Sequence, residues 1–223
     1  MSKTVLITGT SKGIGLALAK AFLAQGYHVI GTCRTGTIPA LVHPQAEVLP
    51  LDLSNLSSIH AFEEYFITRS IGLDLLINNA GIGPDLDTDR PEAVSFQQTF
   101  DVNVTGTTFL TELMVKYLRP NGKIINISSK MGSIDRCELT DSVAYRMSKA
   151  ALNMYTKILA NRLVGSLKVA AVHPGWVRTT ISKSNVNGRL SPEQSAQRII
   201  DFSTSDFRNG IFWNVETQAE CEW

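Results

Sequence analysis

Residues 4–24 read TVLITGTSKGIGLALAKAFLA, and this stretch decides the fold. Residues 4–8 predict a short strand, the glycine-rich residues 9–15 predict a turn, and residues 16–24 predict a helix. Glycines let the backbone approach a phosphate closely, and a helix begins with unpaired N–H groups at the positive end of its dipole. The spacing G-x-x-x-G-x-G differs from the commoner dinucleotide fingerprint G-x-G-x-x-G. The stretch therefore predicts either a phosphate-binding turn or a tight strand–helix turn without a ligand.

The next predicted strand, residues 27–34, ends in Cys33 and Arg34. NAD-binding folds usually carry an Asp or Glu at this point to hold the ribose hydroxyls, and here that acid is missing. An arginine can instead pair with a 2′-phosphate through charge-assisted hydrogen bonds. We therefore predict NADP(H) as the cofactor, with Lys12 as a second phosphate-binding candidate. Both charges could also be ordinary solvated side chains, and this alternative is stronger for Lys12.

Strand and helix patterns alternate along the rest of the chain. This alternation predicts a single doubly wound α/β Rossmann domain over residues 1–223, with a mostly parallel sheet of about seven strands and helices on both faces. Two helix starts carry serine caps, at Ser54 and at Ser191. Within the helical segment 95–118, residues 101–108 are poor helix formers and predict a local distortion. The further strands are predicted at residues 47–51, 73–77, 122–128, 168–173 and 210–215.

Tyr145 and Lys149 are four residues apart in a predicted helix, so they lie on one face of it. A nearby ammonium favours phenolate, which would lower the tyrosine pKa towards the range where the phenol can transfer protons. The same spacing also occurs by chance on many amphipathic helices. The pair therefore identifies a catalytic site only together with other polar residues.

Such residues follow the predicted strands, where ligands bind in folds of this class. Asn78-Asn79-Ala80-Gly81 can cap backbone groups or line a ligand crevice, and Asp52 can contact an adenine or simply form a turn. Ser128 and Ser129 follow a strand without the Gly-x-Ser-x-Gly elbow of a serine hydrolase, and can contact a carbonyl or close a loop. Asn103 can serve chemistry or be a satisfied interior amide. His173 has no evident partner in the sequence, and we interpret it as a structural histidine.

Composition excludes several other classes of protein. The chain has 21 basic and 20 acidic residues, so we expect no nucleic-acid partner. Its three cysteines lack C-x-x-C spacing, so neither a disulfide framework nor a metal site is expected. We find no signal peptide and no stretch of the roughly 18–20 apolar residues that a membrane span needs. We therefore expect a cytoplasmic protein with a small-molecule partner.

Together, these motifs resemble the classical short-chain dehydrogenase/reductase family over essentially the whole chain. The segments YRMSKAALN at 145–153 and PGWVRT at 174–179 are most similar to the C-factor and sniffer-type carbonyl reductase branch. The resemblance implies that Tyr145 is the general acid, that Lys149 lowers its pKa and holds the nicotinamide ribose, and that Ser129 orients the carbonyl. It also implies that Asn103 holds a water in the proton relay. The implied cofactor-binding residues are Gly9, Ser11, Lys12, Gly13, Ile14, Gly15, Arg34, Asp52, Leu53, Asn79, Ala80, Gly81, Tyr145, Lys149, Pro174, Gly175, Val177 and Thr179.

Two features depart from the family pattern. Ser129 lies 16 residues before Tyr145, further than in many members; Ser-x-x-Gly132 favours Ser129 over Ser128 as the catalytic serine. The segment 180–188, where members carry a substrate lid, is small and polar, which disfavours a deep steroid pocket.

The sequence thus favours an NADPH-dependent reductase of an aldehyde, ketone or quinone. The alternative is a nucleotide-binding regulatory or signalling protein that uses the fold without turnover. A sugar epimerase would need a larger substrate-binding part than this chain holds. The resemblance further implies a homodimer or homotetramer assembled through the helical segments 96–118 and 143–163.

Overall fold

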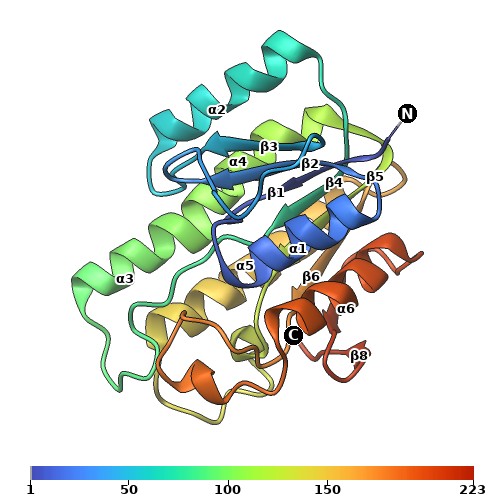
Figure 1. The fold of residues 1–223 in the computed structure, drawn as a ribbon. Helices are drawn as coiled ribbons and strands as arrows, with labels where there is room; N and C mark the ends of the chain where they lie inside the picture. The colour runs from blue at the N-terminus through green and yellow to red at the C-terminus, as the bar shows by residue number, and fades with distance from the viewer. Residues whose placement is uncertain (1) are drawn as a thin grey trace.

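A computed structural model describes residues 2–223; Met1, which the predicted domain includes, lies outside the described residues. Eight strands form one sheet in the order β3-β2-β1-β4-β5-β6-β7-β8, in which only the last pair is antiparallel (Figure 1). This arrangement confirms the predicted doubly wound α/β fold. The strands are β1 (Thr4–Ile7), β2 (His28–Cys33), β3 (Ala46–Pro50), β4 (Leu73–Asn78), β5 (Leu118–Ile127), β6 (Lys168–His173), β7 (Ile211–Asn214) and β8 (Ala219–Glu220).

The helices cover both faces of this sheet (Figure 1). The helices α1 and α6 pack on one face, and α2, α4 and α5 pack on the other. The α-helices are α1 (Gly13–Ala24), α2 (Leu56–Arg69), α3 (Ala93–Phe100), α4 (Thr107–Met114), α5 (Val143–Arg162) and α6 (Pro192–Thr204). Shorter helical segments are η1 (Asp101–Gly106), η2 (Val115–Tyr117), η3 (Lys130–Gly132) and η4 (Ser184–Asn187).

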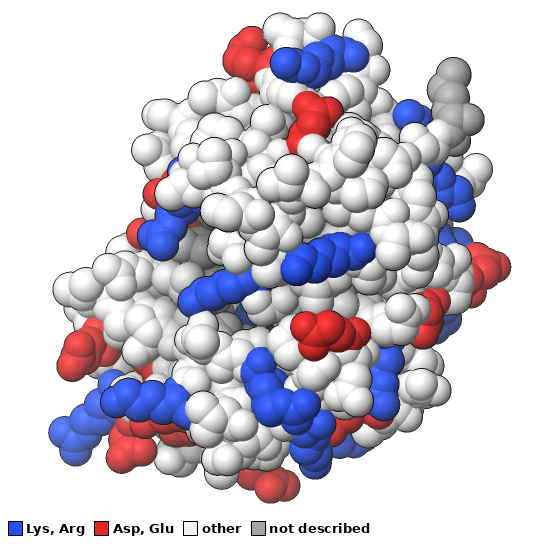
Figure 2. Space-filling model, in the orientation of Figure 1, with Lys and Arg blue, Asp and Glu red and all other residues white. Residues whose placement is uncertain are grey.

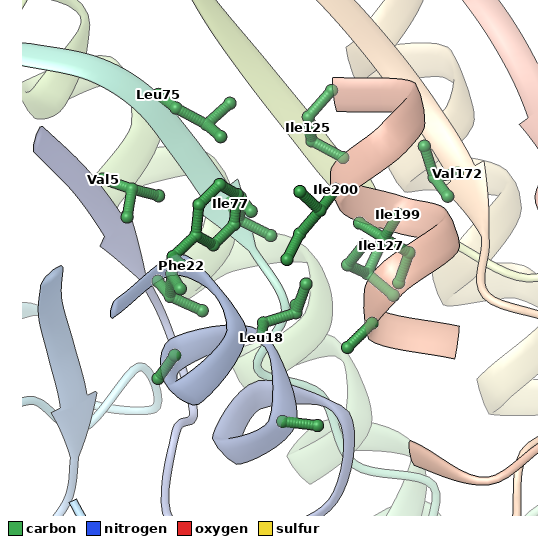
Figure 3. Close-up of a cluster of buried hydrophobic side chains, with 14 of the residues drawn as sticks. Val5, Leu18, Phe22, Leu75, Ile77, Ile125, Ile127, Val172, Ile199 and Ile200 are labelled. Carbon is green, nitrogen blue, oxygen red and sulfur yellow. The ribbon is translucent and has the colours of Figure 1, made fainter. Parts of the chain in front are cut away.

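Alternate residues of the central strands contribute side chains to two separate hydrophobic cores, as expected for a sheet buried on both faces. Figure 3 shows one core, in which Leu18 and Phe22 of α1 and Ile199 and Ile200 of α6 meet Ile77 and neighbouring strand residues. Each of these five side chains is at most 1% exposed. Burial of each such side chain stabilises the folded state by about 1.5–3 kcal/mol. The two cores therefore hold the strand ends in place.

The predicted distortion within residues 101–108 is confirmed as a π-helix, η1, between α3 and α4. Close packing accompanies it, because a Cβ on Gly106 would lie 1.9 Å from the Leu53 carbonyl oxygen. The widened turn carries Asn103, which is 1% exposed. A π-bulge inside a helix is frequent at functional sites.

The number of strands and the caps of two helices were also predicted. The sheet has eight strands because a short turn after β7 adds Ala219–Glu220, which is too short to show an alternating pattern. The cap of α2 is Asn55 and not Ser54, whose side chain donates to Asp52 Oδ1 at 2.7 Å. The Ser191 cap is confirmed, because Ser191 and Gln194 form a capping box at the start of α6.

The surface carries charges of both signs. Figure 2 shows basic and acidic side chains interspersed over the face that includes α1 and α6. No helix among residues 2–223 combines the length and apolar character needed to cross a bilayer. The cytoplasmic location stays a prediction.

Candidate active site

The glycine turn after β1 is packed too tightly for larger residues. Gly9 has φ +71°, and a Cβ on Gly15 would lie 2.1 Å from the Gly9 carbonyl oxygen. Asn79 fixes the turn, because its Nδ2 donates to the carbonyl oxygens of Thr8 at 2.9 Å and Gly9 at 3.1 Å. Gly9 and Gly15 are thus required by close packing within the protein. The predicted approach of this turn to a phosphate stays a prediction.

The turn leads into α1, whose first residue is Gly13 and whose cap residue, Lys12, provides no side-chain cap. The amino-terminal N–H groups of α1 therefore suit an anion. Lys12 Nζ donates to Thr180 Oγ1 at 2.7 Å, which links the turn to the segment after β6.

Arg34 is exposed at the end of β2, and within residues 2–223 no ion pair involves it. Hydrogen bonds from Ser54 lower the pKa of Asp52, and the nearby Arg34 charge lowers it further. Asp52 thus forms a local turn close to Arg34. Leu53 is buried against Gly106.

Tyr145 and Lys149 lie one turn apart near the start of α5, and both are buried. Lys149 Nζ donates to the Ile127 carbonyl oxygen at 2.9 Å and lies 5.6 Å from the centre of the Tyr145 ring. Burial lowers the pKa of Lys149 to about 8. Burial also raises the pKa of Tyr145 to about 12; the nearby Ser129 hydroxyl opposes this rise, and the Asp85 charge adds to it. The expected lowering of the tyrosine pKa is therefore wrong for this pocket, because desolvation of the phenolate outweighs the effect of the Ser129 hydroxyl.

The two candidate serines have different partners. Ser128 Oγ donates to Asn153 Oδ1 at 2.6 Å, inside the protein. Ser129 Oγ accepts from the Met131 N–H at 3.1 Å. It also lies near the Tyr145 hydroxyl, whose pKa it lowers. The geometry therefore brings Ser129, and not Ser128, together with the phenol.

Asn103 on η1 binds the segment that follows β4. Its side chain accepts from the Ile82 N–H at 2.9 Å and donates to the Ile82 carbonyl oxygen at 2.8 Å and to Ser148 Oγ at 3.1 Å. A Cβ on Gly81 would lie 3.3 Å from Asn103 Oδ1 and 3.5 Å from Lys149 Nζ. Asn103 is thus a satisfied interior amide that also lies close to Lys149.

Asp85 is a residue of this site that the sequence reasoning missed. It is 2% exposed, and its Oδ2 accepts the N–H groups of Ala144 at 2.7 Å and Tyr145 at 3.2 Å. The local cap residue of α5, Ser142, makes no side-chain cap, so Asp85 supplies one from another loop. No local pattern indicates this, because the cap residue and the helix are about 60 residues apart in the chain.

A cavity of about 840 Å³ opens over these residues at the carboxyl ends of β5 and β6. This volume is within the usual range for small-molecule sites. It is also lined by residues that were not predicted, including Leu86, Met131 and Trp176, and by Ile181 of the segment 180–188 where a lid is expected. The predicted site residues that line it are Ile14, Asn79, Gly81, Ser129, Tyr145, Lys149, Pro174, Gly175, Val177 and Thr179. The others, Gly9, Ser11, Lys12, Gly13, Gly15, Arg34, Asp52, Leu53, Ala80 and Asn103, are outside its lining.

The segment after β6 closes one side of this cavity. The two ends of this segment are joined by an isolated β-bridge between Val177 and Leu190. Asn185 Nδ2 donates to the Val177 carbonyl oxygen at 2.9 Å, and Ser184 Oγ donates to Asp87 Oδ1 at 3.0 Å. The Asn185 contact fixes the segment internally, and the Ser184 contact holds it against the loop that follows β4.

Comparison with known proteins agrees with this geometry. The family model for short chain dehydrogenase matches residues 3–189. Galactitol 2-dehydrogenase from Agrobacterium fabrum is 34% identical over 185 residues, which cover 79% of this chain and 71% of that enzyme. Several other relatives are matched over only 60–63% of their own length.

Solved carbonyl reductases share the whole fold. The NADPH-bound carbonyl reductase from chicken fatty liver is 28% identical, with a TM-score of 0.88 over 100% of this chain and 99% of that one. The carbonyl reductase Sniffer of D. melanogaster is also 28% identical, with a TM-score of 0.87 over 100% of both chains. The predicted resemblance to this branch is thus confirmed. From its strand order, its glycine turn and the match over residues 3–189, the chain belongs to the short-chain dehydrogenase family.

Proposed function

We propose that this protein is an NADPH-dependent reductase that converts an aldehyde, ketone or quinone to the alcohol, with Tyr145 as general acid. The observation that carries the proposal is the convergence of Tyr145, Ser129 and Lys149 on one cavity at the strand ends. A protein that only binds a nucleotide has no evident use for a buried phenol beside a buried amine.

The residues present fit NADPH. The uncapped start of α1 and the close-packed glycine turn suit a pyrophosphate, and Arg34, outside any ion pair within residues 2–223, suits a 2′-phosphate. The NADPH-bound carbonyl reductase of similar fold supports the same assignment. When bound, NADPH supplies the hydride that reduces the carbonyl carbon.

The pocket residues then handle the proton and the charge. With a pKa raised to about 12, Tyr145 stays protonated at neutral pH and can donate to the carbonyl oxygen. Ser129, which lies near the Tyr145 hydroxyl, would hold the same oxygen as negative charge develops. The nearby ammonium of Lys149 would stabilise the phenolate that forms when Tyr145 has donated its proton.

A carbonyl panel with NADPH tests the proposal. The protein should oxidise NADPH with at least one aldehyde, ketone or quinone, and Tyr145→Phe should lower kcat at least hundredfold while NADPH still binds. Wild-type protein that binds NADPH but reduces no carbonyl would instead be the nucleotide-binding regulator.

Cofactor choice has its own test. Arg34→Asp should weaken NADPH binding at least tenfold and change NADH binding little, because only NADPH carries the 2′-phosphate. Arg90→Asp, at an exposed arginine beyond β4, is the matched control. Equal losses for both cofactors in Arg34→Asp would contradict the assignment.

A further inference from the structure

Asn153 of α5 is a buried polar residue to which the proposed chemistry gives no role. Its side chain is 4% exposed. It lies one turn after Lys149 and about two turns after Tyr145, on the same side of the helix. The helix face that carries the proposed proton donor and the ammonium thus carries a third buried polar group.

This amide binds both ends of the turn that carries Ser129. Its Oδ1 accepts the Ser128 hydroxyl at 2.6 Å, and its Nδ2 donates to the Gly132 carbonyl oxygen at 3.2 Å. Both hydrogen bonds are buried, so water does not compete for them. A single side chain therefore spans residues 129–131 and ties the turn to α5.

Inside the turn, Ser129 is linked to the anchored Gly132. The Gly132 N–H donates to the Ser129 carbonyl oxygen at 2.9 Å, and the Met131 N–H donates to Ser129 Oγ at 3.1 Å. The helical segment η3 has only three residues, and a helix of this length is not stable by itself. The orientation of the Ser129 hydroxyl therefore depends on how the turn is attached to the rest of the protein.

The turn lies directly on the backbone of α5. A Cβ on Gly132 would lie 2.6 Å from the Lys149 carbonyl carbon and 2.8 Å from the Ala150 nitrogen. Just before the turn, the Ile127 carbonyl oxygen accepts from Lys149 Nζ at 2.9 Å. The turn and the Tyr145 side chain are thus held by one helix, which sets the distance between them.

We propose that Asn153 is a positioning residue, which holds Ser128 and Gly132 so that the Ser129 hydroxyl stays beside the Tyr145 hydroxyl. The inference rests on the proposed carbonyl reductase function. In that reaction Ser129 must meet the same carbonyl oxygen as Tyr145. A displacement of about 1 Å at such a site can lower the rate a hundredfold.

A double-mutant cycle with Ser129 tests the proposal. Asn153→Ala should lower kcat about ten- to hundredfold and leave the KM for NADPH within about twofold, because it displaces a donor to the developing oxyanion. In the Ser129→Ala background the same substitution should lower kcat less than about threefold, since no hydroxyl is left to position.

Thr156→Ala is the matched control. Thr156 is also fully buried on α5, and its hydroxyl accepts from Asn126 Nδ2 of β5 at 2.9 Å, away from the turn. Its loss should lower stability but change kcat less than about twofold. Three results would overturn the inference: an unchanged kcat in Asn153→Ala, an equal loss in Thr156→Ala, or an equal effect of Asn153→Ala with and without the Ser129 hydroxyl.

A second measurement does not need turnover. Amide hydrogen exchange, followed by NMR, should be at least about tenfold faster at Met131 and Gly132 in Asn153→Ala than in Thr156→Ala or wild type. If the protein reduces no carbonyl, the proposed function fails, and these two amides alone decide whether Asn153 holds the turn. Exchange rates equal to those of Thr156→Ala would overturn the inference.

Discussion

Burial raises the pKa of Tyr145 and lowers the pKa of Lys149, the two site residues on α5. It holds Tyr145 in the neutral, proton-donating form, with a pKa of about 12. It brings the pKa of Lys149 down to about 8, so its ammonium is only marginally stable in the pocket. The pair therefore suits the proposed carbonyl reduction at neutral pH, whereas the reverse oxidation would need a phenolate that is scarce there.

This balance predicts the pH dependence of the reaction. Lys149 loses its proton as pH rises through about 8, while Tyr145 keeps its proton until about 12. The kcat/KM for carbonyl reduction should therefore be flat from pH 6 to about 7.5 and fall above pH 8, approaching tenfold per pH unit. Alcohol oxidation should instead rise with pH. A reduction rate that stays constant up to pH 10 would contradict a role for the Lys149 ammonium.

The sequence was sufficient to predict which residues meet at this site. It was not sufficient to predict their hydrogen-bond partners or the direction of the tyrosine pKa shift. Spacing of four residues was sufficient to bring Tyr145 and Lys149 together. The choice between Ser128 and Ser129 depended on Asn153, 25 residues further on, which takes the Ser128 hydroxyl. The direction of the tyrosine pKa depended on burial, and burial is a property of the whole fold.

At the scale of elements, the start of α5 depends on a residue from another loop. Asp85 accepts two N–H groups there, and the negative carboxylate also suits the positive end of the helix dipole. The loop is fixed to the helix a second time, because the Ser142 N–H donates to the Thr88 carbonyl oxygen at 2.9 Å. The position of Tyr145 thus depends on contacts that link β4 to α5.

Asp85→Ala should lower the free energy of unfolding by about 1–3 kcal/mol, because it removes the cap and leaves two buried N–H groups without an acceptor. Asp85→Asn keeps an acceptor and should lose less. Urea denaturation measures both, with Asp89→Ala in the same loop as an exposed control. If Asp85→Ala were as stable as Asp89→Ala, the capping role would be wrong.

Elements with a clear periodic pattern were predictable, and short or unusual ones were not. Poor helix formers indicated a distortion after Phe100, but the π-helical form depends on packing of Gly106 against Leu53. The strand β8 has only two residues, and its pairing depends on the turn after β7. The Asn55 cap was missed because Asn55 and Ser54 are adjacent and have similar capping chemistry.

At the scale of the molecule, α4 and α5 form a connected surface with exposed apolar residues. Glu112 of α4 accepts hydrogen bonds from Tyr155 and Arg162 of α5, so the two helices lie side by side. Phe109 is 52% exposed, Met154 63% and Ile158 52%. On their helices they are one turn from these linking residues or from each other, so they share the surface. Such apolar residues on neighbouring helices favour association.

We therefore expect wild-type protein to be a dimer or tetramer that uses this surface. Introducing charge with Met154→Glu and Ile158→Glu should give monomers, since burying two carboxylates in an apolar interface is costly. Light scattering after size-exclusion chromatography measures the mass. Ile67→Glu, at an exposed apolar residue of α2, should leave it unchanged. A monomeric wild-type protein would contradict the expected assembly.

The central claim is that Tyr145 protonates a carbonyl while hydride arrives from NADPH. The most direct measurement is mass spectrometry of the alcohol formed from an aldehyde and from a ketone with NADPH deuterated at the transferable C4 position. We predict that wild-type protein gives alcohol with one deuterium on the former carbonyl carbon, and that Tyr145→Phe forms it at least a hundred times more slowly. Unlabelled alcohol, no alcohol from any carbonyl, or equal rates for the two proteins would contradict the claim.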